Sequence, residues 1–186
     1  NKADYINYLH LQPHPERLDR QIYHSADTFV PATVDKERYY YTSIYFLLDA
    51  SSPSHFHRLK HDELWYYHAG DPITIYTFYP NGSSNQVVLD PHLEKGEQLQ
   101  YRISAGVIFG SAVNAAGFSL VSCAVAPGFD YHDFEIFDQQ QSKHSLSAPG
   151  TPADNAVIEH YWGDFKYIWM AHHSHPQTLT GYSTGL

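Results

Sequence analysis

The chain of 186 residues is poor in cysteine and has no long apolar run. Its single cysteine, Cys123, excludes an intramolecular disulfide, and its position in the apolar stretch 120–125 indicates a buried, unreactive strand thiol. No segment approaches the about 18 consecutive apolar residues of a membrane span, and no charged segment followed by an apolar one opens the chain. We therefore expect a soluble protein without membrane association, with a cytoplasmic location favoured. The start at Asn1 leaves open a leader that precedes it.

Positive charge is scarce as well. The chain has 11 lysines and arginines against 20 aspartates and glutamates, which gives a net charge of -9 with neutral histidines. The basic residues are scattered along the sequence. Binding to nucleic acid depends on clustered cations that contact phosphates. The composition therefore argues against a nucleic-acid partner.

Aromatic and aliphatic residues are abundant instead. Hydrophobic residues make up 42% of the chain and aromatic residues 16%, which is too apolar for a disordered protein. Charged residues account for 17%, less than the usual quarter of a globular domain. A chain of this length can bury one core, so we expect a single domain with appendages.

Short aromatic and β-branched segments separated by turn residues indicate the fold class. The run 39–48 predicts a strand, and the segments 73–79 and 85–89 predict a β-hairpin around a turn that is rich in Asn and Gly. Further turn signals lie at 51–53, 70–72, 95–97 and 115–117. Regularly spaced strands of this kind predict an all-β sandwich or barrel.

The flanks of this region differ from it in composition. Residues 5–11 predict a short helix that ends before Pro13 and Pro15, since a proline disfavours helical geometry in the residue before it. After residue 138 a polar, proline-containing linker leads to a tail rich in aromatics and histidines. We therefore divide the chain into an N-terminal segment that packs on the barrel, 1–37, a β-barrel, 38–138, and a C-terminal extension, 139–186.

One constellation in the barrel region could carry chemistry. His55 and His57 are two residues apart, which predicts that they share one face of a strand, and Glu63 can return on the next antiparallel strand. Two imidazoles and a carboxylate form either an open metal site or an acid/base cluster. Alternation from Glu63 also directs Trp65 and Tyr67 inward.

These residues carry a resemblance to a known family. The pattern His55-x-His57, Glu63 and Gly70 resembles the first motif of the cupin superfamily, and 104–106 resembles the second. The chain is similar to a cupin branch catalogued as a domain of unknown function (cupin-5-like). The matching segments are 11–16, 44–48, 57–58, 62–65, 69–72, 105–107, 125–130 and 133–135. The resemblance implies a cupin jelly-roll β-barrel and a homodimer, but no single reaction.

The chain also departs from the cupin pattern. The resemblance implies a proline at the start of the second motif and a metal-binding histidine three residues after its glycine, where this chain has Ser104 and Phe109. A phenylalanine cannot bind a metal. At most three protein ligands would therefore remain, namely His55, His57 and Glu63.

Three functions are compatible with these residues. The first is an isomerase, epimerase, cyclase or lyase in which His55 and His57 transfer protons and Glu63 orients them. Its small, partly apolar substrate would lie among four aromatic side chains, namely Tyr45, Trp65, Tyr67 and Phe109. The second is an oxygenase or hydrolase in which His55, His57 and Glu63 bind a single divalent metal. The third is a barrel that binds a small ligand without converting it.

Other polar residues receive plainer interpretations. His61 lies between charged neighbours in a predicted turn, so we expect it to be solvated. Asp130, Asp133 and Glu135 could line the rim of the barrel or have a structural role at a strand end. The tail histidines in 172–175 lack a recognisable ligand pair before them, which favours a surface or interface role.

Overall fold

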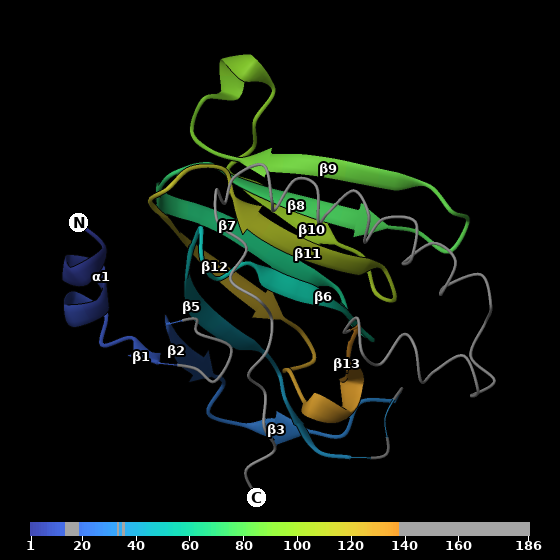
Figure 1. Ribbon diagram of the computed structural model, residues 1–186. Helices are drawn as coiled ribbons and strands as arrows, with labels where there is room; N and C mark the ends of the chain where they lie inside the picture. Colours follow the sequence, from blue (N-terminus) through green and yellow to red (C-terminus); the bar gives the residue numbers. More distant parts are fainter. Residues whose placement is uncertain (14–18, 33, 35, 138–186) are drawn as a thin grey trace, which may run out of the picture.

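The computed structural model describes residues 1–13, 19–32, 34 and 36–137. Within them, two large antiparallel sheets face each other and form a jelly-roll-like barrel (Figure 1). One short helix, α1 (Lys2–Tyr8), lies at one side of it. The prediction of an all-β barrel with a short N-terminal helix is thus confirmed. No helix among the described residues has the length and apolarity needed to cross a membrane.

The first sheet has six strands. Their order is β1 (Gln12–Pro13), β2 (Asp19–His24), β5 (Thr42–Asp49), β12 (Phe118–Val125), β7 (Glu63–Gly70) and β10 (Gln100–Ile103). The strand β12 lies in the middle, between β5 and β7, although it is among the last strands of the described chain.

The second sheet has five strands. Their order is β13 (Phe134–Ile136), β6 (Ser54–Leu59), β11 (Ile108–Val113), β8 (Ile73–Phe78) and β9 (Ser84–Leu89). The strands β8 and β9 pair from Ile73 opposite Leu89 to Phe78 opposite Ser84, which confirms the predicted hairpin. The smaller elements are β3 (Thr28–Phe29), β4 (Arg38–Tyr39), η1 (Leu93–Lys95) and η2 (Tyr131–Asp133).

The N-terminal segment contributes strands to the barrel. Ile22 of β2 lies opposite Ile44 of β5, so the six-stranded sheet extends into residues assigned above to a packing segment. The strand predicted over 39–48 is divided into β4 and β5. Residues 138–186 lie outside the described residues, and so do the expectations for the C-terminal extension and its histidines.

The core fills the space between the two sheets. Alternate residues of each strand point inward, and the largest buried side chains there are Trp65 of β7 and Phe109 of β11, each 1% exposed. A second cluster lies on the outer face of the six-stranded sheet, where Tyr5 and Ile6 of α1 pack on Leu47 and Leu120. The helix therefore covers the part of this face around Leu47 and Leu120 and leaves the interior to the strands.

Candidate active site in the barrel interior

The predicted site residues come from both sheets. His55 and His57 lie on β6 in the five-stranded sheet, while Glu63 begins β7 in the six-stranded sheet. The strand β7 pairs with β10 and β12 and not with β6, so the carboxylate returns on the opposite sheet and not on the neighbouring strand as expected. The turn at 60–62 carries the chain from one wall of the barrel to the other.

A β-bulge separates the two histidines. Opposite β11, His57 pairs with Phe109 and Ser54 pairs with Ser111, so β6 has one residue more than its partner over this stretch. Because cross-strand partners share a face, Ser54 and His57 lie on the inward face together with Phe109. The expectation that His55 shares this face is wrong, and the His55 side chain is exposed.

The His57 ring is enclosed by aromatic side chains. Its centroid lies 4.1 Å from that of Phe109 and 5.2 Å from that of Phe134. Its Nδ1 lies 2.7 Å from the backbone oxygen of His55. This contact occupies one ring nitrogen, so Nε2 is the nitrogen available for another partner. Burial lowers the pKa of His57 to about 4, so the imidazole is neutral at neutral pH.

Glu63 is a buried carboxyl group in the barrel interior, 8% exposed. Burial raises its pKa to about 7, and the neighbouring Trp65 indole and Cys123 thiol offset part of this rise. Among the described residues, neither Oε2 of Glu63 nor Nε1 of Trp65 has a hydrogen-bond partner of good geometry. Glu63 therefore combines a free acceptor with a proton affinity near neutrality.

Aromatic side chains pack beside these groups. Trp65 and Phe109 lie edge to face with centroids 6.3 Å apart, and Tyr67 packs against the same cluster. Tyr67 donates a hydrogen bond from its hydroxyl to the backbone oxygen of Gly70 at 2.6 Å. Tyr45 belongs to the outer cluster and contacts Tyr23, so its predicted role as an inner wall is corrected.

The family of the chain follows from a comparison with known protein families. The model of a family described as Cupin superfamily (DUF985) matches residues 3–137. The chain belongs to this cupin family. No curated protein matches it.

Solved structures agree with this assignment. A hypothetical protein from Leishmania major is 39% identical, covers 85% of this cupin and 96% of its own chain, and has a TM-score of 0.70. A protein from Shewanella oneidensis is 42% identical, with coverages of 79% and 94% and a TM-score of 0.68. Oxalate decarboxylase from Bacillus subtilis, at 10% identity, a TM-score of 0.53 and coverages of 80% and 37%, is similar in fold alone.

The three predicted metal ligands do not form a compact donor group in this cupin. Among the described residues, a set of at least three His, Cys, Asp or Glu ligand atoms within 4.8 Å of one another occurs in the loop after β9, at Asp90, His92 and Glu97. His55 points away, and the Phe109 ring packs against His57. The residues His55, His57 and Glu63 thus do not fit a metal in this arrangement.

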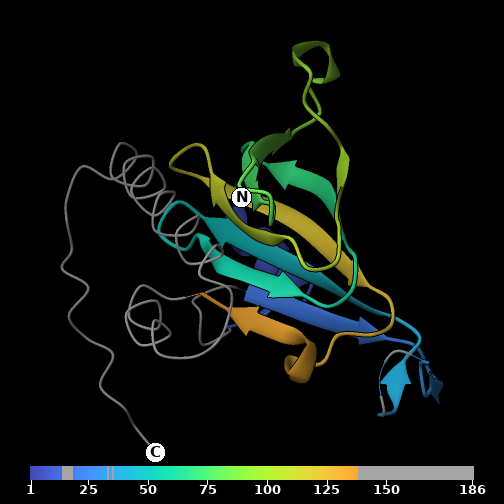
Figure 2. The ribbon, with the colours of Figure 1, turned by 90° about the vertical axis from the view of Figure 1, so that its right-hand side faces the viewer.

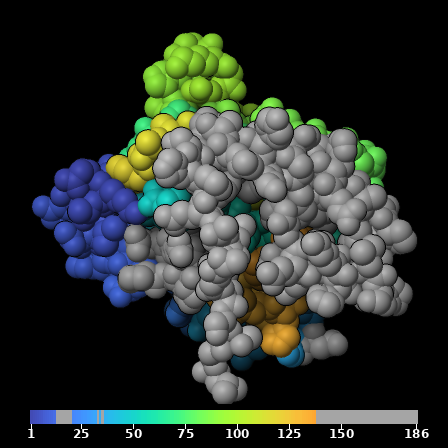
Figure 3. Space-filling view, in the orientation of Figure 1, coloured from blue at the N-terminus to red at the C-terminus, as the bar shows by residue number. Residues whose placement is uncertain are grey.

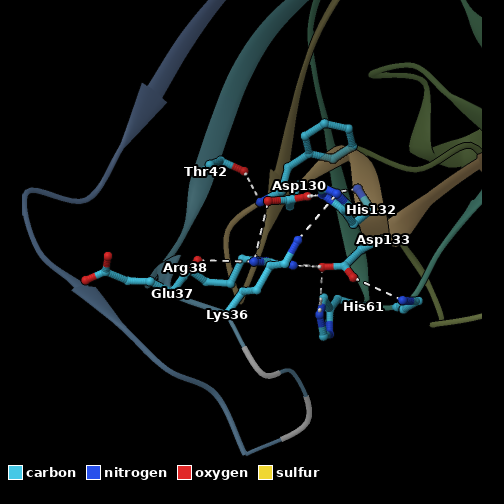
Figure 4. A network of polar contacts seen from close by, with 10 residues as sticks. Lys36, Glu37, Arg38, Thr42, His61, Asp130, His132 and Asp133 are labelled. Atoms are coloured by element: carbon cyan, nitrogen blue, oxygen red, sulfur yellow. Dashed lines mark hydrogen bonds and ion pairs between the residues drawn. The ribbon is translucent and has the colours of Figure 1, made fainter.

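A network of ion pairs around Asp133 lies beside the turn between β6, which carries the two histidines, and β7, which carries Glu63 (Figure 4). Asp133 of η2 is 5% exposed, and its carboxylate lies 3.2 Å from Nη2 of Arg38 and 3.3 Å from Nζ of Lys60. Nε2 of His61 lies 3.7 Å from the same carboxylate, and the His61 side chain is 13% exposed. The expectation of a solvated His61 is therefore wrong, while the network agrees with a structural role for Asp130 and Asp133.

Proposed function

We propose that this cupin converts a small, partly apolar organic molecule by acid/base chemistry of the isomerase, epimerase, cyclase or lyase type. The observation that carries the proposal is the buried carboxyl of Glu63, with its unpartnered Oε2 and its pKa of about 7. A proton-transfer group works best when its pKa lies near the working pH. Such a group inside an aromatic barrel is a candidate for a functional site.

The two titratable groups have separate roles in this proposal. Glu63 is present in both protonation states near pH 7, so it can accept a proton from carbon or oxygen and return it to another position. His57 stays neutral and has Nε2 free to orient a substrate by hydrogen bonding. These assignments exchange the roles that the sequence suggested, because a pKa of about 4 keeps the His57 imidazole neutral near pH 7, whereas the pKa of Glu63 is about 7.

The neighbouring aromatic side chains support a partly apolar substrate. Trp65 and Phe109 are aromatic, and the indole N–H of Trp65, which lies beside the Glu63 carboxyl, makes no hydrogen bond of good geometry among the described residues. A carbonyl or hydroxyl group of the substrate could accept from it. The chemistry therefore favours a hydroxy or oxo compound with an apolar part.

Exchange of carbon-bound hydrogen with solvent tests this proposal directly. The full chain would be incubated in D₂O with a panel of hydroxy acids, oxo acids and sugars, and deuterium in each compound would be measured by mass spectrometry. We expect incorporation into at least one compound, because a base that removes a proton from carbon returns a deuteron. Glu63→Gln should reduce the exchange rate by about 10²-fold or more.

The matched control is Glu135→Gln, which removes an exposed carboxylate and leaves the interior unchanged. This variant should keep the wild-type exchange rate. Exchange that is equally fast in Glu63→Gln, or absent from every compound tested, would contradict the proposal. A compound that binds without exchange would identify a ligand-binding cupin in place of an enzyme.

Metal-dependent oxygenase or hydrolase chemistry is the second candidate. Mn(II) centres are named for the oxalate decarboxylase of Bacillus subtilis, which shares the fold. In this chain His57 has Nε2 available, but His55 and Glu63 do not form a compact donor group with it, so a metal would require these side chains to rearrange. Elemental analysis of protein purified without a His tag tests it. Less than about a tenth of an equivalent of transition metal, or activity that a chelator leaves unchanged, would contradict this candidate.

We also infer a homodimer that forms through the outer face of the six-stranded sheet. Tyr23, Tyr41 and Leu64 there are between 38% and 49% exposed, and such apolar exposure supports a protein contact. Sedimentation equilibrium of the wild type and of Leu64→Glu tests the inference. The wild type should have twice the monomer mass, and a monomeric wild type would contradict it.

A further inference from the structure

The loop between β9 and β10 stands out from the barrel (Figures 1 and 2). It carries a group of ligand-type side chains at its base. In the space-filling view it forms a projecting knob (Figure 3). Its two limbs are joined at the root, where the Asp90 backbone N–H donates to Gln98 O at 3.0 Å. The Gln98 N–H donates to Val88 O at 2.9 Å.

The path of the loop brings three side chains together at this root. Asp90 starts one limb and Glu97 ends the other, while Gly96 adopts a left-handed conformation with φ of 83° and turns the chain back after η1. The ligand atoms of Asp90, His92 and Glu97 lie within 4.8 Å of one another. The three residues are thus close in space although they come from different limbs of the loop.

The polar contacts inside this group leave one oxygen unused. Oδ1 of Asp90 accepts from the His92 backbone N–H at 3.1 Å and also contacts Nδ1 of His92. Oε2 of Glu97 lies 3.8 Å from the same Nδ1, which is too far for a hydrogen bond. This oxygen is buried and has no hydrogen-bond partner among the described residues.

The electrostatics of the group favour a cation. The Asp90 side chain is 3% exposed, and the Glu97 side chain, 17% exposed, supplies a second carboxyl group whose ligand atom lies within 4.8 Å of that of Asp90. Two adjacent carboxylates in a poorly solvated place repel each other, and a bound cation between them would offset this repulsion. A ligand 2.0–2.2 Å from a metal lies roughly 3 to 4 Å from its neighbours, so small side-chain movements would complete the site.

We propose that Asp90, His92 and Glu97 bind a divalent transition-metal ion that joins the two limbs of this loop. One imidazole nitrogen and two carboxylate oxygens suit Mn²⁺, Fe²⁺ or Zn²⁺, whereas Mg²⁺ prefers oxygen ligands alone. His92 is 53% exposed, which leaves the outer side of the ion to water. The site is separate from the barrel interior, and it does not depend on the chemistry proposed for Glu63.

A second Asp-x-His pair in the same chain provides an internal comparison. Oδ1 of Asp130 accepts from the His132 backbone N–H at 2.8 Å and lies 2.6 Å from His132 Nδ1, as in the first pair. Its other neighbour is Nη1 of Arg38 at 3.4 Å, a cation in the position where Glu97 supplies a carboxylate. The Asp-x-His turn alone therefore does not make a metal site. The third ligand, Glu97, distinguishes the loop after β9 from the turn at Asp130.

Paramagnetic broadening by Mn²⁺ tests the proposal at residue resolution. In ¹H–¹⁵N spectra of the full chain, substoichiometric Mn²⁺ should broaden the amide signals of residues 89–98, and Zn²⁺ should restore them by competition. Glu97→Gln, which keeps the side-chain size, should weaken Mn²⁺ binding at the loop by at least about tenfold. His132→Ala should leave it unchanged.

The readout is local, so metal bound by histidines elsewhere in the chain does not affect the conclusion. Unchanged spectra outside the loop in Glu97→Gln would show that this variant is folded. Loop signals that persist in excess Mn²⁺ would overturn the proposal. Equal affinities of the wild type and Glu97→Gln would overturn it as well, because they would mean that the carboxyl pair is balanced by a shared proton.

Discussion

The imidazole ring of His57 packs against the phenyl ring of Phe109, with the ring centroids 4.1 Å apart. The two residues are cross-strand partners on β6 and β11. Phe109 also contacts Trp65, so one phenyl ring links the histidine to the opposite sheet. An aromatic side chain thus stands where the cupin pattern predicts a metal-binding histidine, and it keeps His57 neutral by excluding water.

Replacement of Phe109 by alanine should destabilise the barrel strongly. Its side chain is 1% exposed and lies in the centre of the main cluster, so truncation leaves a cavity. We expect a loss of about 3–5 kcal/mol in the free energy of unfolding, measured by urea denaturation. Leu93→Ala is the control, because Leu93 is 57% exposed and its loss should cost less than about 0.5 kcal/mol. Similar losses in both variants would contradict the central position of Phe109.

The pH dependence of stability should change in Glu63→Gln. Burial raises the pKa of Glu63 to about 7 in the folded state, above its usual value of 4.5, so the proton favours folding. This stabilisation is complete below pH 4.5 and is lost as the pH rises through 7. Glutamine cannot ionise, so the stability of the variant relative to the wild type should increase between pH 4.5 and 7. Urea denaturation across this range measures the difference, and a constant difference would count against the raised pKa.

The buried ion pair of Asp133 with Arg38 should contribute more to the free energy of unfolding than the exposed pair of Glu135 with Arg58. Both side chains are 4% exposed, so Asp133→Asn leaves a buried guanidinium without its main partner. We expect a loss of about 3–5 kcal/mol. Glu135→Gln breaks the pair of Glu135 with Arg58, where the carboxylate is 54% exposed, and should cost at most about 1 kcal/mol. Denaturation curves that give equal losses would refute the structural importance assigned to the network.

The thiol of Cys123 should be unreactive in the folded protein. Burial raises its pKa well above the ordinary range, and the nearby Glu63 carboxylate adds to this effect. Only the thiolate attacks disulfide reagents, so an aromatic disulfide should react with Cys123 after unfolding in urea but not before. Absorbance of the released thiolate measures the reaction. Rapid release from the folded protein would show that the strand opens readily.

Local patterns predicted the parts of the fold that depend on local geometry. The hairpin of β8 and β9 followed from a turn rich in Asn and Gly between two β-branched segments. The inward position of Trp65 and Tyr67 followed from simple alternation along β7. In both cases the determining residues are neighbours in the sequence.

The errors arose where the geometry depends on distant partners. The bulge that turns His55 outward exists only because β6 has an extra residue opposite β11, which no pattern within β6 reveals. Tyr45 lies in the apolar segment 44–48, where alternation does not distinguish the two faces of the strand. His61 is buried by Asp133, which is far away in the sequence. The sequence does not reveal the loop group of Asp90, His92 and Glu97, because its ligands meet only when the root of the loop closes.

The central position of β12 has a consequence for how the chain folds. Ser122 pairs with Tyr45 on one side and with Tyr66 on the other, and both partners are synthesised much earlier. Until residue 125 has left the ribosome, β5 and β7 each present an unpaired edge with no neighbour between them. Contacts between such distant segments slow folding, and open edges favour association between chains. The nascent protein is therefore most exposed to aggregation just before its middle strand arrives.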